Sequence, residues 1–283
     1  MTFRAALLQL CAGDDPETNL EATETALRDA AARGATLALT PECTNLLAAS
    51  RERQAEVLCL EAEDPTLARL RSLAHELDLT IVAGSLALRA EFPETRFANR
   101  CLVIGPDGGI LARYDKIHMF DVSLDAGETY RESATYRPGT RAVIVEAAET
   151  CLGLSICYDL RFPALYRDLA LAGARILTIP AAFTVPTGAA HWHVLLRARA
   201  IETGCFVLAP AQTGDHPSAS GRPRQTYGHS LAVSPWGEVL ADAGTDPGVT
   251  IVELDLGQVD KARTRIPALR HLRPWQGPEA RHI

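Results

Sequence analysis

The chain alternates short apolar segments with longer segments that begin at proline, stop before glycine, or do both. Proline is favoured at the first position of a helix and glycine just after the last. Helices are therefore predicted over 16–33, 65–77, 163–172 and 189–203. Apolar strands are predicted over 3–10, 36–39, 80–88, 99–104, 110–114, 141–145, 152–157, 176–179, 206–211, 229–234, 238–241 and 249–255. This order predicts a mixed α/β fold, in which βαβ units and antiparallel hairpins form sheets with helices on their faces.

One segment resembles another at a distance of 139 residues. Residues 28–41 and 167–180 agree at six of fourteen positions, and each contains a helix end, a glycine, a buried strand and a proline. Chance agreement in an alanine-rich chain is one explanation. The other is a pair of pseudo-symmetric βαβ halves, whose strand ends would meet at one site.

Charge and cysteine content exclude several classes of protein. A net charge of −7 argues against a general binder of nucleic acid or of anionic membranes, and no apolar window is long enough for a transmembrane helix. The N-terminal apolar stretch is short and is interpreted as a strand rather than a signal peptide. Seven scattered cysteines without a CxxC pair are typical of a reducing compartment, so a cytoplasmic location is expected.

Cys157 is a candidate nucleophile because it follows an apolar strand and precedes a helix that starts at Pro163. A strand–turn–helix corner exposes one side chain next to backbone N–H groups. The thiol would need a base or a positive neighbour to become a reactive thiolate. The alternative is a buried structural thiol, which is the usual state of a free cysteine.

Two charged residues could activate such a thiol. Glu42 follows a buried strand, where partial burial is expected to raise its pKa toward the range of a general base. Lys116 is one of only two lysines, and its ammonium could stabilise a thiolate and then an oxyanion. Alternatively, Glu42 is a helix cap or surface carboxylate and Lys116 a surface lysine.

Other catalytic templates are missing from the sequence. It contains no HExxH, GxSxG, Gx4GK[ST] or GxGxxG pattern, and a Cys–His pair is not excluded by spacing. His191 and His193 lie two apart on a predicted helix and so point to different sides. No metal and no cofactor are therefore expected.

Glu42, Lys116 and Cys157 together resemble the Glu-Lys-Cys triad of the nitrilase superfamily of carbon–nitrogen hydrolases. The resemblance includes the segments around these residues and continues nearly to the end of the chain, over 40–42, 114–120, 153–163, 190–192, 196–202, 227–230 and 235–237. It implies a single carbon–nitrogen hydrolase domain over residues 1–275, followed by a tail over 276–283.

The resemblance implies a four-layer αββα sandwich of two mixed sheets, paired into a homodimer or higher homo-oligomer. It also implies a second glutamate, for which Glu132 is the most similar residue, that holds Lys116 and assists the base. In the implied mechanism Glu42 deprotonates Cys157, and Lys116 with the backbone N–H of Tyr158 stabilises the oxyanion. Water then hydrolyses the thioester.

The segment from Cys157 to Gly214 is most similar to the branch of deaminated glutathione amidases. Alternatives are omega-amidase action on 2-oxoglutaramate, or hydrolysis of an N-carbamoyl or other linear amide. A non-catalytic module is disfavoured because the triad is intact. The expected partner is a small amide that carries a carboxylate, not nucleic acid or membrane.

The sequence also offers candidates for the residues that bind the substrate. Arg161 is the first candidate for binding the substrate carboxylate, unless it pairs with Asp159, and Phe183 and Thr187 are weaker candidates. His193 stands where the family commonly has Glu, and residues 218–224 lengthen a loop that could border the site.

Overall fold

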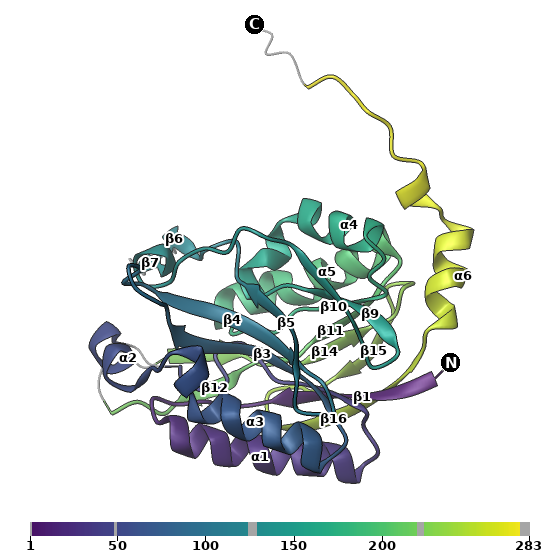
Figure 1. The fold of residues 1–283 in the computed structure, drawn as a ribbon. Helices are drawn as coiled ribbons and strands as arrows, with labels where there is room; N and C mark the ends of the chain where they lie inside the picture. The colour runs from purple at the N-terminus through teal and green to yellow at the C-terminus, as the bar shows by residue number, and fades with distance from the viewer. Residues whose placement is uncertain (1, 48–49, 124–128, 220–223, 278–283) are drawn as a thin grey trace, which may run out of the picture.

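The computed structural model describes residues 2–47, 50–123, 129–219 and 224–277. Two six-stranded sheets lie face to face with helices outside them (Figure 1). The first sheet has the order β16 (Gly248–Asp255), β1 (Thr2–Gln9), β2 (Leu37–Leu39), β3 (Thr80–Arg89), β4 (Phe97–Ile104) and β5 (Ile110–Asp115). The second has the order β15 (Val239–Asp242), β14 (Leu231–Val233), β11 (Phe206–Ala209), β10 (Ile176–Thr178), β9 (Thr150–Leu154) and β8 (Val143–Ala147).

Each sheet is covered by two helices on its outer face. In Figure 1, α1 (Pro16–Ala32) and α3 (Pro65–Glu76) lie below the first sheet. The helices α4 (Pro163–Leu171) and α5 (Val185–Thr203) lie on the far side of the second sheet. One apolar core joins α1 and α3 to the first sheet, and a larger core fills the space between the sheets and reaches α4 and α5. The predicted αββα sandwich is confirmed.

The two sheets have matching topologies, which explains the internal sequence resemblance. In each sheet three parallel strands follow one another, β1–β2–β3 and β9–β10–β11, and antiparallel strands flank them. The similar segments are the α1–β2 and α4–β10 units, which occupy equivalent positions. The interpretation as two pseudo-symmetric halves is therefore confirmed.

Two predicted boundaries are wrong near the site. The strand predicted to reach Cys157 ends at Leu154, because Cys157 has a φ of 50° and begins a 3-10 turn, Cys157–Arg161. The helix predicted from residue 189 begins at Val185, because Pro186 fits its first turn.

Several elements are absent from the prediction. They are the helices α2 (Arg51–Val57) and α6 (Gly257–Arg265) and the two-stranded pairs β6 (Asp121–Ser123) with β7 (Thr129–Arg131) and β12 (Thr213–His216) with β13 (Arg224–Tyr227). After α6 the chain extends away from the body (Figure 1). Of the predicted loop 218–224 and tail 276–283, residues 220–223 and 278–283 lie outside the described residues.

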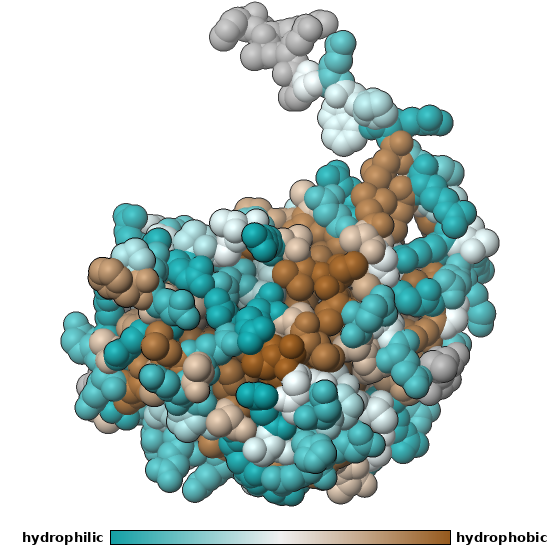
Figure 2. Space-filling view, viewed as in Figure 1, coloured by the Kyte–Doolittle hydropathy of each residue, from teal (hydrophilic) through white to brown (hydrophobic). Residues whose placement is uncertain are grey.

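Figure 2 shows that the face seen in Figure 1 is largely hydrophilic, with a continuous apolar area near its centre. Within the described part of the chain, none of the helices combines the length and apolar composition needed to cross a bilayer.

Candidate active site

The two central strands, β2 and β10, end facing each other, and the candidate residues gather around these ends. Gly84 allows the close approach, since a Cβ at this position would lie 1.8 Å from the Thr40 carbonyl oxygen and 2.4 Å from Pro180 Cβ. Glu42 lies three residues after the end of β2, and the Gln212 side chain donates a hydrogen bond to the Glu42 backbone carbonyl at 3.0 Å. Both halves of the fold therefore hold Glu42 in place.

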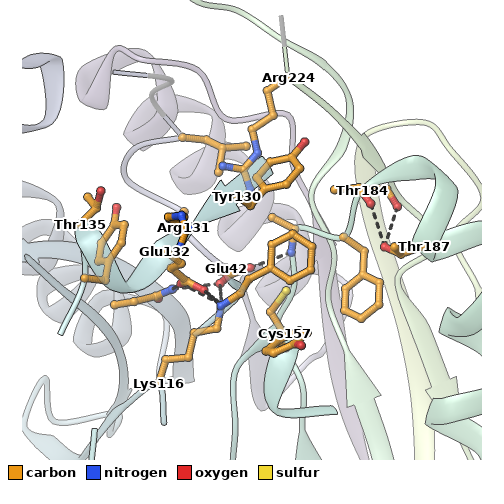
Figure 3. A pocket seen from close by; sticks show the side chains of 18 of the residues that line it. Glu42, Lys116, Tyr130, Arg131, Glu132, Thr135, Cys157, Thr184, Thr187 and Arg224 are labelled. Carbon is orange, nitrogen blue, oxygen red and sulfur yellow. Dashed lines mark hydrogen bonds and ion pairs between the residues drawn. The ribbon is translucent and has the colours of Figure 1, made fainter. Parts of the chain in front are cut away.

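Glu42, Lys116 and Glu132 form a buried charged cluster. Lys116 Nζ lies 2.8 Å from Glu42 Oε1 and 2.9 Å from each carboxylate oxygen of Glu132. Glu42 is 4% exposed and Lys116 is 2% exposed, so neither charge is solvated. Figure 3 shows the lysine head group between the two carboxylates, with the Cys157 sulfur facing the same place.

Further donors hold the two carboxylates. Asn99 Nδ2 donates to Glu42 Oε1 at 2.9 Å and to Glu132 Oε1 at 3.3 Å. The backbone N–H of Ala182 donates to Glu42 Oε2 at 3.0 Å, and that of Phe120 donates to Glu132 Oε2 at 2.7 Å. A buried ion cluster is tolerated only when such bonds satisfy it, so these groups keep the cluster ionised and fixed.

Cys157 lies at the corner between β9 and α4. Its backbone N–H donates to the Pro180 carbonyl at 2.8 Å, and its φ of 50° is in the left-handed region. A non-glycine residue pays a steric cost there, which neighbouring contacts must hold. The thiol hydrogen-bonds Glu42, and the residue is 8% exposed. The Asp159 N–H donates to the Ile156 carbonyl at 3.0 Å, whereas the Tyr158 N–H lies in the first turn of the 3-10 helix, where an intrahelical acceptor is not expected.

The directions of the pKa shifts indicate which of these groups carry a proton at neutral pH. Burial, together with the negative charge of Glu42, raises the pKa of the Cys157 thiol well above its usual value. Burial also acts to raise the pKa of Glu42, but Lys116 and the hydrogen bonds from Cys157 and Asn99 outweigh it and lower the pKa. The expected rise in the pKa of Glu42 is therefore wrong, because its cationic neighbour dominates.

The pKa of Lys116 moves in the opposite direction. Burial would lower it, but the charges of Glu132 and Glu42 outweigh this effect and raise the pKa well above its usual value. At neutral pH the cluster thus holds a neutral thiol, a carboxylate that faces it and an ammonium. A base with an adjacent nucleophile and an electrophilic cation is the arrangement that covalent acyl transfer requires.

Asp159 ties the nucleophile turn to the lysine segment. Its Oδ2 accepts from Tyr114 Oη at 2.6 Å and from the Ile156 N–H at 2.9 Å. Its Oδ1 accepts from the His118 N–H at 3.0 Å and lies 2.6 Å from the ring nitrogen Nδ1 of His118. Lys116 is bracketed by Tyr114 and His118, so this single carboxylate fixes its segment relative to Cys157.

A cavity of about 290 Å³ opens above the charged cluster. Its lining includes the predicted residues Tyr158, Arg161, Phe183 and Thr187. The alternative pairing of Arg161 with Asp159 is not what the structure has. The Arg161 guanidinium instead lies 3.3 Å from His191 Nδ1 and about 5.6–5.8 Å from the ring centres of Phe183 and Tyr158.

Sequence reasoning missed several lining residues, among them Asn99, Tyr130, Arg131 and Arg224. In Figure 3, Arg224 and Tyr130 lie across the cavity from Lys116. Asn99 carried a usable signal, since it is a polar residue in a predicted apolar strand. Arg131 and Arg224 carried none, because they come from short polar strands. The lining residues include four cationic and two anionic side chains, so the cavity favours anionic ligands.

The fold and this cluster define a class of enzyme, the hydrolases of carbon–nitrogen bonds. The sequence profile described as carbon-nitrogen hydrolase matches residues 4–264, and the chain belongs to this family.

Relatives match nearly the whole chain. A deaminated glutathione amidase of Synechocystis is 40% identical over 95% of this chain and 97% of its own. The human omega-amidase NIT2 is 34% identical, over 96% of this chain and 95% of its own. Among solved structures, the C. elegans NitFhit protein has a TM-score of 0.88 at 34% identity, covering 96% of this chain and 65% of that longer one. Saccharomyces cerevisiae Nit3 has a TM-score of 0.82 at 27% identity, covering 94% of each chain.

Proposed function

We propose that this chain hydrolyses the amide bond of deaminated glutathione and releases 2-oxoglutarate and cysteinylglycine. The observation that carries the proposal is a cationic cavity with Cys157, Glu42 and Lys116 buried at its base. The name of the Synechocystis relative, identical at 40% of positions, supports the choice of substrate.

In the first half-reaction Glu42 takes the thiol proton and Cys157 Sγ attacks the amide carbonyl carbon. The oxyanion that forms is stabilised by the Lys116 ammonium and the backbone N–H of Tyr158. The C–N bond then breaks, and Glu42 returns the proton to the leaving amine. The acyl group remains on Cys157 as a thioester.

In the second half-reaction Glu42, again a carboxylate, deprotonates a water molecule that attacks the thioester carbonyl. The C–S bond breaks, the acid leaves, and the thiolate regains the proton from Glu42. Glu132 serves as a positioning residue, because its two oxygens hold Lys116 Nζ at 2.9 Å and keep it directed toward the reacting carbonyl.

The substrate has two carboxylates, one on the keto-acid side of the scissile amide and one on its terminal glycine. Arg161 is the last residue of the nucleophile turn and lines the cavity, so we assign it to the keto-acid carboxylate. Arg224 lies across the cavity and is assigned to the glycine carboxylate (Figure 3). A guanidinium can bind each carboxylate with two parallel hydrogen bonds.

A coupled assay of 2-oxoglutarate release tests this, because 2-oxoglutaramate gives the same product but lacks the glycine carboxylate. The wild type should prefer deaminated glutathione, and Cys157→Ala should release nothing from either substrate. Arg161→Met should lower kcat/KM for both substrates and Arg224→Met only for deaminated glutathione. Arg167→Met, on the exposed face of α4, is the matched control.

A preference of the wild type for 2-oxoglutaramate would instead favour the second candidate, an omega-amidase. That candidate rests on the 34% identity to the human omega-amidase. Equal losses on both substrates in Arg224→Met would contradict the assignment of Arg224.

We also propose a homodimer or higher homo-oligomer in a cytoplasmic, reducing setting. Val194 and Ile201 on α5 are 68% and 56% exposed, and apolar surface of this kind favours contact with a second copy. All seven cysteines are free thiols, which supports a reducing compartment. Light scattering coupled to size-exclusion chromatography tests the first part, and a monomer at micromolar concentration would contradict it.

A further inference from the structure

A second cluster of chemically active side chains lies outside the cavity. His193 comes from α5, His229 follows β13, and Asp242 ends β15. None of the three lines the reaction cavity. Asp242 Oδ2 lies 2.9 Å from His193 Nε2, and its Oδ1 lies 2.9 Å from His229 Nδ1.

The three groups present their ligand atoms toward one point. These atoms all lie within 4.8 Å of one another. Ligands bound at about 2.0–2.1 Å to a tetrahedral zinc ion lie about 3.3 Å apart. The two distances from the Asp242 oxygens to the imidazole nitrogens are 2.9 Å, and no separation in the set exceeds 4.8 Å, so side-chain rotations alone can reach that geometry.

We propose that His193, His229 and Asp242 bind one divalent transition-metal ion of the zinc type. Two imidazoles and a carboxylate suit zinc and its neighbours, whereas magnesium and calcium prefer all-oxygen sites. The three side chains are 24–34% exposed, so water can complete the coordination.

The surrounding contacts hold the ligands before any ion binds. His229 has a φ of 56°, and it is held there by its N–H bond to the Gly244 carbonyl at 2.7 Å and by Trp192 Nε1, which donates to its carbonyl at 2.8 Å. The Gly244 N–H donates to Asp242 Oδ1 at 2.9 Å. The Tyr227 ring stacks on the His229 ring at 4.5 Å. Metal sites depend on such supporting contacts around the direct ligands.

The ion would act as a clamp rather than as a catalyst. It would join α5 to the chain after β13 and to β15, which are separate in sequence. The first turn of α5 and the first residue of β13 line the cavity through Thr187 and Arg224, so the clamp would stiffen two of the cavity walls.

A different arrangement fits the same distances without a metal. Asp242 could simply accept hydrogen bonds from two neutral imidazoles. The two possibilities differ in one measurable property, which is whether the cluster takes up a metal in a defined ratio.

Zinc binding to the full chain distinguishes them. We would use Cys157→Ala as the parent, because the candidate nucleophile could otherwise bind zinc itself. Protein stripped with a chelator is titrated with zinc chloride by calorimetry, and bound metal is counted by elemental analysis. The test variants are His193→Gln and Asp242→Asn, and the matched control is His75→Gln, which changes an exposed histidine on α3.

The proposal expects one zinc per chain in the parent and in the control, with affinity at least tenfold lower in both test variants. It also expects Tm to rise by about 5 °C when free zinc is a hundred times its Kd, with no rise from magnesium. Absence of stoichiometric binding in the parent would overturn it. So would equal binding in His193→Gln and Asp242→Asn, which would place the zinc on other side chains.

Discussion

Tyr114→Phe removes one hydroxyl from the network that joins the lysine segment to the nucleophile turn. The ring of Tyr114 is 1% exposed and Asp159 is 0% exposed, so phenylalanine can occupy the same space without changing the packing. Burial and the negative charge of Asp159 raise the pKa of Tyr114, which keeps the phenol protonated and always a donor. The variant therefore leaves Asp159 Oδ2 with only the Ile156 N–H.

The expected loss of stability follows from the 2.6 Å hydrogen bond that Tyr114 Oη donates to the Asp159 carboxylate. A hydrogen bond to a charged group contributes about 1.5–3 kcal/mol, against about 0.5–1.5 kcal/mol for a neutral pair. Tyr166→Phe is a matched control, because that buried hydroxyl donates to the neutral Ser155 hydroxyl at 2.9 Å. We expect Tyr114→Phe to lower the free energy of unfolding by about 2 kcal/mol and Tyr166→Phe by about 1 kcal/mol.

The two variants should also differ in catalysis. Loss of the Asp159 contact loosens Lys116 relative to Cys157, and a barrier increase of about 1.4 kcal/mol lowers kcat about tenfold. KM should change little, because neither tyrosine lines the cavity. Urea unfolding and steady-state kinetics on one substrate measure both effects. Equal losses of stability and of kcat in the two variants would refute the argument that Asp159 sets the geometry of the site.

Three further predictions follow from other contacts. Glu132→Gln keeps the shape of the side chain but removes the negative charge that contacts Lys116. The value of kcat/KM should therefore fall about 10- to 100-fold, with an unchanged circular dichroism spectrum. Burial lowers the pKa of His216 to about 4, so the unfolded chain binds more protons below about pH 6.5 and stability falls as the pH drops toward 4. His216→Gln should flatten that decline in chemical denaturation, and an unchanged slope would contradict it. Gly188→Ala should lower Tm and raise KM, since a Cβ there would lie 2.3–2.6 Å from atoms of Tyr227, and an unchanged thermal melt would count against this packing.

The sequence predicted the elements whose ends carry strong chemical signals. Proline at the start of α1, α3 and α4 located these helices to within a residue. The elements it missed are short and polar, such as β12 with the sequence TGDH. Their strand conformation comes from pairing with a distant segment, β13, and not from local preference.

The sequence predicts only those residues of the candidate site that the family resemblance identifies. The resemblance points to Glu42, Lys116, Glu132 and Cys157, and the structure brings these four residues together. These residues lie 16 to 115 positions apart in the sequence, so no local spacing pattern predicts that they come together. The direction of the Glu42 pKa shift was wrong for the same reason, since it depends on which cation the fold places beside the carboxylate.

The position of the cluster follows from the pairing of two similar halves. Glu42 follows the central strand of the first half, and its carboxylate accepts the Ala182 N–H just beyond the central strand of the second. Cys157 comes from the second half and is held by the Pro180 carbonyl.

Two bonds that cross between the halves end on Glu42, since the Ala182 N–H donates to its carboxylate and the Gln212 side chain donates to its backbone carbonyl. The charged groups Glu42, Lys116 and Glu132 all come from the first half. A buried carboxylate and ammonium are costly unless their hydrogen bonds are satisfied, and the second half supplies one such bond through the Ala182 N–H. The chemistry of the site and the association of the two sheets therefore depend on the same few contacts.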